Sequence, residues 1–291
     1  MAVYTINNSI LQVQIADKGA ELQCIYHTEN QIDYLWNGDT AFWAKKSPVL
    51  FPIVGGLKQN TYYYNEKAYY LNRHGFARDM VFKVQQQTDN AIQLVLTDSP
   101  ETLQVYPFRF VFTIQYTIVT NCLMVEYTVE NIDSVNMYFS LGAHPAFAVP
   151  LTADTVYEDY FLQFSQTENA GIWPLTDGGL LQEVPVPFLQ NSPTIALHKS
   201  LFYKDALVFK HLHSESVRLH NTKNKHGINL QFPDFPYLGI WAAKDADFVC
   251  IEPWCGVADS NHSNQQLVQK EGIRVLVPHT KFIRSWNVAV Y

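Results

Sequence analysis

The chain has 291 residues, of which 47% are hydrophobic and 16% are charged. This composition provides for a large core and gives little sign of disorder. Lys and Arg total 20 against 27 Asp and Glu, a formal charge of -7, so we expect no nucleic-acid partner. The length fits one continuous β-rich unit, and we expect a single domain over residues 1–291.

Alternation of apolar and polar residues with a period of two predicts β-strands through most of the chain. In the first half we expect strands at 11–16, 21–26, 62–64, 69–71, 91–96, 108–118 and 123–129. The last two alternate most regularly, and the turn-like Thr120-Asn121 between them predicts an antiparallel hairpin.

The second half continues this pattern, with strands expected at 137–141, 216–219, 228–232, 248–252, 274–277 and 285–290. Short helices are expected at 40–44, 101–106 and 264–270, and none has a long amphipathic stripe. Residues 170–200, rich in Gly, Pro and Leu, predict a long irregular connection. Many strands without a helical layer favour an all-β fold of large antiparallel sheets with few short helices.

The N-terminal residues lack the basic stretch and apolar run of a signal peptide, and no segment is long and apolar enough to span a bilayer. We therefore expect a cytoplasmic protein with no membrane partner. Its cysteines match no paired zinc pattern, so we expect reduced thiols. Cys250 and Cys255 flank Glu252, but no basic residue adjoins them to lower a thiol pKa, and we interpret both as buried structural thiols.

Three short segments place titratable residues among glycines, prolines and aromatics. In the first, Arg73 and Arg78 bracket His74, which precedes Gly75. A histidine there can be purely structural. However, guanidinium groups beside an imidazole favour a nearby anion, carboxylate or polar ligand.

His144 and Glu252 occupy the other two segments. His144 follows a predicted strand ending in Gly142-Ala143, so small residues leave room over the imidazole, although a core histidine is the alternative. Glu252 follows the apolar run 248–251, where burial raises a carboxyl pKa toward the range of a general base; the alternative is a buried ion pair. Trp241 and Trp254 are candidate sugar platforms or core residues.

Other catalytic classes have less support. By residue type, His74, His144 and Glu252 match a zinc or non-haem iron set, but they are scattered along the sequence, and we expect no metal. There is no Gly-x-Ser-x-Gly motif, and the glycine-rich segment 55–59 lacks the Gly-Lys-Ser/Thr ending of a phosphate-binding loop.

Several further segments occur together with these three in a fixed order along nearly the whole chain. They are Lys18-Gly19-Ala20-Glu21-Leu22, Ser47-Pro48-Val49-Leu50-Phe51-Pro52-Ile53-Val54-Gly55, Asp205-Ala206-Leu207-Val208-Phe209 and the run from Tyr237 to Trp241. With them the chain resembles the aldose 1-epimerase, or galactose mutarotase, superfamily. The resemblance is closest to its branch of bacterial mutarotase-related proteins associated with lactose and tagatose metabolism.

The resemblance implies a galactose mutarotase-like β-supersandwich that interconverts the α and β anomers of a hexose or hexose 6-phosphate. Glu252 would be the base acting on the anomeric hydroxyl, His144 the acid acting on the ring oxygen, and His74 a group that helps to polarise one of these oxygens. Such chemistry requires no metal or organic cofactor, and the partner is a small-molecule sugar. A non-catalytic carbohydrate-binding or sensing module on the same fold is the alternative.

The chain departs from the family pattern at positions that bear on the substrate. Gly56 replaces a common arginine, Lys45 and Lys46 replace an arginine pair, and Pro278-His279-Thr280 replaces a Pro-Gly-Glu type turn. These departures leave the expected acid and base unchanged and concern positions that would clamp the sugar or its phosphate.

Three residues are expected to bind substrate. Arg78, with Lys45, Lys46 or Arg73, can hold a sugar phosphate, and its alternative role is a salt bridge to Asp79. Asp205 can accept hydrogen bonds from sugar hydroxyls, although an Asp before a strand is often a turn former. Trp241 is the third substrate-binding candidate.

Overall fold

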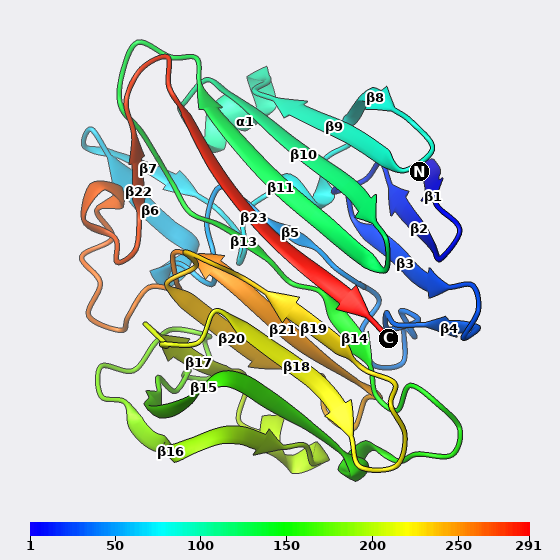
Figure 1. The fold of residues 1–291 in the computed structure, drawn as a ribbon. Helices are drawn as coiled ribbons and strands as arrows, with labels where there is room; N and C mark the ends of the chain where they lie inside the picture. The colour runs from blue at the N-terminus through cyan, green and yellow to red at the C-terminus, as the bar shows by residue number, and fades with distance from the viewer.

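The computed structural model describes residues 1–291 and is built mainly of antiparallel strands, with one short α-helix (Figure 1). This confirms the all-β expectation of large antiparallel sheets with few short helices. None of the helices combines the length and apolar character needed to cross a bilayer.

The largest sheet has nine strands and joins the two halves of the chain. In spatial order these are β16 (Val186–Ala196), β15 (Tyr160–Ile172), β18 (Ser216–Asn221), β19 (Ile228–Gln231), β23 (Lys281–Val290), β11 (Cys122–Asn131), β10 (Phe110–Val119), β9 (Ala91–Thr97) and β8 (Lys83–Gln87). The predicted hairpin is confirmed as β10 and β11, with Val119 opposite Cys122. The C-terminal strand β23, red in Figure 1, pairs with β11 on one side and β19 on the other.

A second sheet of six strands carries two of the three segments with candidate catalytic residues, those of His144 and Glu252. Its order is β17 (Leu207–Lys210), β20 (Tyr237–Trp241), β21 (Phe248–Cys255), β13 (Leu141–Ala143) and β5 (Val49–Leu50), and β14 (Ala146–Ala148) also pairs with β21. Every residue of β21 is buried.

The core lies between these two sheets. Phe51, next to β5, stacks on Phe112 of β10 with ring centroids 4.7 Å apart, and Phe164 of β15 meets Phe209 of β17 at 6.1 Å. These contacts belong to one cluster of 71 buried hydrophobic residues. The six-stranded sheet is therefore covered on one face by the nine-stranded sheet, as expected for packed sheets.

Smaller elements complete the fold. Four strands, β1 (Val3–Asn7), β2 (Leu11–Ala16), β3 (Leu22–His27) and β4 (Ile32–Asp33), form one sheet, and the pairs β6 (Thr61–Tyr64) with β7 (Lys67–Tyr70) and β12 (Met137–Phe139) with β22 (Arg274–Leu276) form two others. The helices are α1 (Pro100–Val105) and the 3-10 turns η1 (Lys58–Asn60), η2 (Ala77–Asp79), η3 (Tyr157–Asp159), η4 (Lys199–Phe202) and η5 (Leu267–Gln269).

Of the three expected helices, only 101–106 is confirmed, as α1. Residues 40–44 form a single turn, in which the Asp39 carbonyl accepts from the amides of Phe42 and Trp43, and the Trp43 carbonyl accepts from the Trp36 indole instead of continuing a helix. Residues 264–270 contain only η5, because Gln265 has a left-handed φ of 63° that an α-helix excludes.

The prediction of an irregular connection at 170–200 is correct for residues 173–185 and wrong at 170–172 and 186–196, where strands lie. The end of β15 and all of β16 lie in this range and pair with each other. The register of this pairing shifts three times between Gln163 and Gly171. Such bulges break the period-two pattern on which the prediction depended.

Candidate active site

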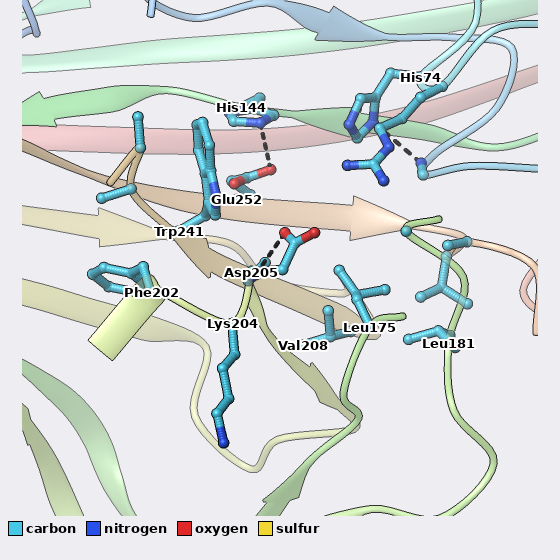
Figure 2. Close-up of a pocket in the computed structure, with 18 of the residues that line it drawn as sticks. His74, His144, Leu175, Leu181, Phe202, Lys204, Asp205, Val208, Trp241 and Glu252 are labelled. Carbon is cyan, nitrogen blue, oxygen red and sulfur yellow. Dashed lines mark hydrogen bonds and ion pairs between the residues drawn. The ribbon is translucent and has the colours of Figure 1, made fainter. Parts of the chain in front are cut away.

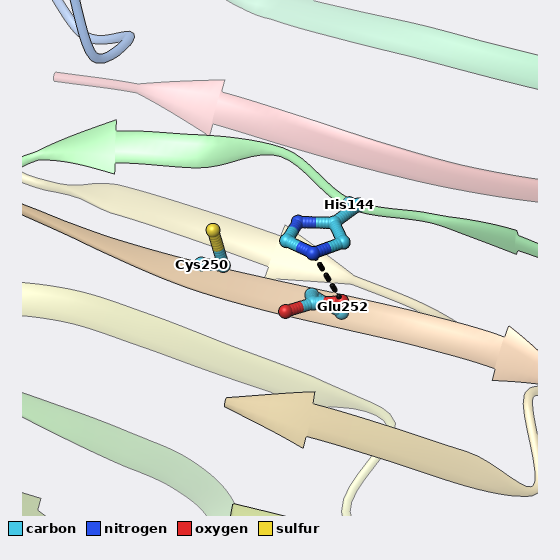
Figure 3. Close-up of side chains that lie close together, drawn as sticks. All are labelled: His144, Cys250 and Glu252. Carbon is cyan, nitrogen blue, oxygen red and sulfur yellow. Dashed lines mark ion pairs between the residues drawn. The ribbon is translucent and has the colours of Figure 1, made fainter. Parts of the chain in front are cut away.

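The strand register brings His144 opposite Glu252. β13 and β14 both pair with β21, placing Gly142 opposite Trp254 and Ala146 opposite Cys250. His144 lies in the break between β13 and β14, and β21 passes beneath it with Glu252 at the level of this break (Figure 3). Pro145 follows, so the break comes at a residue that has no amide hydrogen for a ladder bond.

The two side chains are in direct contact and almost fully buried. Nε2 of His144 lies 3.2 Å from Oε2 of Glu252, with residue exposures of 8% and 1%. Neither Oε2 of Glu252 nor Nδ1 of His144 has an aligned hydrogen-bond partner. Buried polar atoms left in this state are rare, and a bound ligand, an ordered water or a role in a reaction can account for them.

Burial also sets the protonation of the pair. It raises the pKa of the Glu252 carboxyl well above its ordinary value, and the charge of Asp205 adds to this rise. It lowers the pKa of the His144 imidazole to about 3. Burial therefore favours the form of the pair that carries no net charge and holds one exchangeable proton, and this form offers one donor and one acceptor.

His74 adds a second neutral imidazole beside the first. Its ring lies edge-on to the His144 ring with centroids 5.7 Å apart. Its Nδ1 accepts a hydrogen bond of 3.1 Å from the Gly55 amide, so the proton of the neutral ring is on Nε2. Burial, the neighbouring His144 and the two flanking arginines lower the pKa of His74 well below its ordinary value. His74 is thus a fixed hydrogen-bond donor.

These three groups line a cavity of about 700 Å³. Figure 2 shows His144 and Glu252 on one side of it, with Asp205, Leu175 and Leu181 also turned toward it. Residues 175–181, in the connection from β15 to β16, form part of the wall and are fixed by the amide of Leu181, which donates to the Asp259 carbonyl at 2.8 Å. The volume suits a small organic ligand.

Two tryptophans enclose the His144 imidazole. Trp43 stacks on it at 5.1 Å with an angle of 29° between the rings, and Trp241 meets it edge-on at 5.7 Å. Both also line the cavity. The sequence predicts a role for Trp241 but not for Trp43, because Trp43 lies in the segment expected to be helical and belongs to no motif.

The expected substrate-binding residues reach the same cavity. Arg78 lines it and also pairs with Asp79, with Nε and Oδ2 3.7 Å apart, so both of its expected roles are compatible with the structure. Asp205 lines it in a left-handed conformation, with φ of 84°, and its carboxylate accepts from the Ala206 amide at 2.7 Å.

The basic residues around the cavity differ in part from those expected. Arg73 lines it, but Lys45 and Lys46 do not. Nζ of Lys45 lies 3.8 Å from Oε2 of Glu21 and 3.6 Å from Oδ1 of Asp79. Nζ of Lys46 donates to the Gln23 carbonyl. Lys204 and Lys244, which no sequence motif indicates, line the cavity instead. They lie in loops that only tertiary structure brings to the site.

Gly56 lies directly beneath the 175–181 wall. A Cβ atom at this position would be 3.4 Å from the Gly179 carbonyl oxygen and 3.8 Å from that of Gly178. A long side chain in place of Gly56 would have to displace this loop. The guanidinium of Arg73 packs against Gly179 from another direction, so the wall is held in place from two sides.

Comparison with known proteins identifies similar sequences and structures. The family model described as aldose 1-epimerase matches residues 2–274. The plasmid-encoded protein LacX of Lactococcus lactis subsp. lactis is 31% identical over 296 residues, covering 98% of each chain. A galactose mutarotase related enzyme from Lactobacillus acidophilus has 34% identity and a TM-score of 0.96 over 100% of this chain and 97% of the other. A galactose mutarotase-like protein from Lactobacillus casei has 30% identity and a TM-score of 0.94, covering 100% of both chains.

Proposed function

Because the chain belongs to the aldose 1-epimerase family, we propose that it interconverts the α and β anomers of a hexose or hexose 6-phosphate by acid–base opening and closure of the sugar ring. The observation that carries this proposal is the buried contact of 3.2 Å between His144 and Glu252. Anomer exchange needs one group to take a proton and another to give one at the same time, and this pair has that composition.

Glu252 and His144 serve as base and acid in ring opening. Burial favours the uncharged pair, so the proton first passes from the Glu252 carboxyl to Nε2 of His144 across their contact of 3.2 Å. The Glu252 carboxylate then takes the proton of the anomeric hydroxyl, the electrons of that O–H bond form the aldehyde, and the bond from the anomeric carbon to the ring oxygen breaks. The His144 imidazolium gives its proton to the ring oxygen. Rotation of the aldehyde and the reverse proton transfers then close the ring as the other anomer, and the pair returns to its starting state.

The surrounding residues bind and orient the sugar. His74, whose Nε2 is the donor, polarises an oxygen at the reacting end. Asp205 accepts from hydroxyl groups, and the indole of Trp241 offers an apolar face to the C–H side of the ring. Arg73, Arg78, Lys204 and Lys244 supply positive charge along the cavity wall, which is the basis for including a phosphorylated hexose.

Exchange NMR tests this proposal with glucose, galactose and their 6-phosphates as substrates. We expect the wild-type protein to accelerate anomer exchange of at least one of them, and Glu252→Gln, which keeps the side-chain shape but not the basic group, to lose most of this acceleration. Calorimetry on both proteins separates binding from turnover. Sugar binding by the wild type without any acceleration would contradict the proposed activity and favour a carbohydrate-binding module.

A further inference from the structure

A cysteine that the proposed reaction does not use lies next to the catalytic pair. Cys250 is fully buried, two residues before Glu252 on β21, so that both side chains point to the same face of the strand (Figure 3). Its thiol sulfur, a carboxylate oxygen of Glu252 and an imidazole nitrogen of His144 all lie within 4.8 Å of one another. A thiol, an imidazole and a carboxylate in such proximity make a ligand set for a thiophilic metal ion.

The distances fit a tetrahedral ion after a small movement. Two nitrogen or oxygen ligands at about 2.0–2.1 Å from a tetrahedral zinc ion are about 3.3 Å apart, and Nε2 of His144 is 3.2 Å from Oε2 of Glu252. Sulfur binds zinc at about 2.3 Å and then lies about 3.6 Å from the other two ligand atoms. The three atoms are within 4.8 Å of one another, so Cys250 has to approach its neighbours by at most about 1.2 Å. A rotation of its side chain can provide this.

Two further features favour binding of a metal ion by these three side chains. Oε2 of Glu252 is buried 3.2 Å from Nε2 of His144, with which it makes no aligned hydrogen bond, so a cation there gains a carboxylate ligand without breaking a well-formed hydrogen bond. His144 and Glu252 also line the cavity, which gives the ion a route of entry and leaves its fourth position to water. We propose that His144, Cys250 and Glu252 bind a thiophilic divalent cation, Zn²⁺ or Cd²⁺, and that the bound cation inhibits the enzyme.

Inhibition follows from the atoms that the cation occupies. Binding breaks the Cys250 S–H bond, releases the proton to solvent and forms a metal–sulfur bond; any proton on Glu252 leaves in the same way. The imidazole nitrogen and the carboxylate are then coordinated and can neither give nor take a proton. The inhibition rests on the proposed function, whereas binding of the cation does not.

Titration of the metal-free protein with Cd²⁺ tests binding by the ultraviolet charge-transfer band of a cadmium–thiolate bond. We expect the wild type to develop this band with one equivalent of Cd²⁺, and Cys250→Ser and Cys250→Ala to lack it. Cys255→Ser is the matched control, because Cys255 is buried on the same strand but lies outside the cluster, and it should keep the band. A wild type without the band, or a band that persists in both Cys250 variants, would overturn the site.

Anomer exchange measured with added Zn²⁺ tests the inhibition. We expect Zn²⁺ to slow the wild type and a chelator to restore it, and Cys250→Ser to need a Zn²⁺ concentration higher by about tenfold or more, since even loss of an outer-shell partner weakens metal binding by that factor. A cadmium band together with activity unaffected by Zn²⁺ would refute the inhibition while leaving the site. If no substrate is turned over at all, the proposed function fails and the spectroscopic result still decides whether the cation binds.

Discussion

His144 is surrounded by Trp43, Trp241, His74 and Glu252, and these neighbours exclude the water that would stabilise an imidazolium. Its pKa therefore falls to about 3, whereas the same residue in an unfolded chain has a pKa near 6.5. Below pH 6.5 the unfolded chain takes up a proton that the folded protein does not. The free energy of unfolding contributed by this residue is thus present above pH 6.5 and is lost as the pH falls toward 3.

The variant His144→Gln isolates this contribution, because glutamine is neutral at every pH. Between pH 6.5 and 5 we expect the free energy of unfolding of the wild type to fall more than that of the variant by about 1.6 kcal/mol, because the unfolded histidine is half protonated at pH 6.5 and almost fully protonated at pH 5. Urea unfolding in the presence of a chelator measures both proteins. Equal acid dependence would mean that His144 titrates normally in the folded state.

At the scale of single residues, the sequence points to His144 and Glu252 as site residues but does not predict most of the residues around them. His144 and Glu252 were identified because glycines, a proline and an apolar run surround them in the sequence, and these features have a direct physical meaning. Trp43, Lys204 and Lys244 reach the cavity only through tertiary structure, and their own segments carry no comparable signal.

Two glycines on neighbouring strands decide how β21 presents its side chains. Gly142 of β13 is opposite Trp254, and Gly239 of β20 is opposite Glu252. The indole of Trp254 covers both glycines closely, so a Cβ atom at either position would overlap it. Glycine is therefore required here by packing between strands.

Replacing Gly239 by alanine should push the Trp254 indole toward the cavity that it lines. We expect Gly239→Ala to reduce the free energy of unfolding by about 1–3 kcal/mol, the usual effect of overpacking, and to lower the rate of anomer exchange. Gly178→Ala is the control, because a Cβ there meets only the Thr176 hydroxyl, at 3.7 Å. Urea unfolding measures the change in stability, and exchange NMR measures the change in rate. An unchanged free energy of unfolding in Gly239→Ala would show that the Trp254 indole can move without destabilising the protein.

A buried ion pair between Lys270 and Asp259 holds the segment that follows β21 in place. Nζ of Lys270 donates to Oδ1 of Asp259 and to the Val257 carbonyl, both at 2.7 Å, and Oδ2 of Asp259 accepts from the Lys58 amide. Both charged side chains are 3% exposed. Since Val257 lines the cavity, this pair fixes part of the site wall.

Lys270→Met leaves the Asp259 carboxylate buried without its partner, and we expect it to reduce the free energy of unfolding by about 3–5 kcal/mol. The double variant Lys270→Met with Asp259→Asn should lose less free energy of unfolding than the two single variants lose together, because it has no uncompensated buried charge. Lys281→Ala breaks the more exposed pair with Glu130 and should cost less than about 1 kcal/mol. Additive losses in the double variant would show that the two buried charges do not interact.

Strands and hairpins with regular alternation follow from the sequence, as β10 and β11 show. Prediction fails where pairing is bulged, in β15 and β16, and where a left-handed residue such as Gln265 interrupts a short helix. Both failures have the same cause, which is a residue with irregular backbone geometry. In the strands a bulge shifts the alternation of apolar and polar residues, and only the pairing with the neighbouring strand shows that the strand continues. In the short helix the left-handed residue ends the helix although the sequence pattern does not.

The whole molecule is held by one core whose strands come from both ends of the chain. β23 lies between β11 and β19 and so connects the two halves of the largest sheet (Figure 1). The main hydrophobic cluster of 71 buried residues extends from Ile6 to Val290. We propose on this basis that residues 1–291 fold as a single domain.

Differential scanning calorimetry tests this proposal. One cooperative transition is expected, with calorimetric and van't Hoff enthalpies that agree, because no part of the core can be exposed without disrupting the shared sheets. Two separated transitions would show that part of the chain unfolds independently.

The central claim is that His144 and Glu252 act together as one proton-exchanging unit, and a double-mutant cycle on the rate of anomer exchange tests it most directly. His144→Ala and Glu252→Gln should each lower the catalysed rate by about two to four orders of magnitude. The double variant should be no slower than the worse single variant, because removing either group already disables the pair. Losses that multiply in the double variant, or near wild-type exchange in either single variant, would contradict the account.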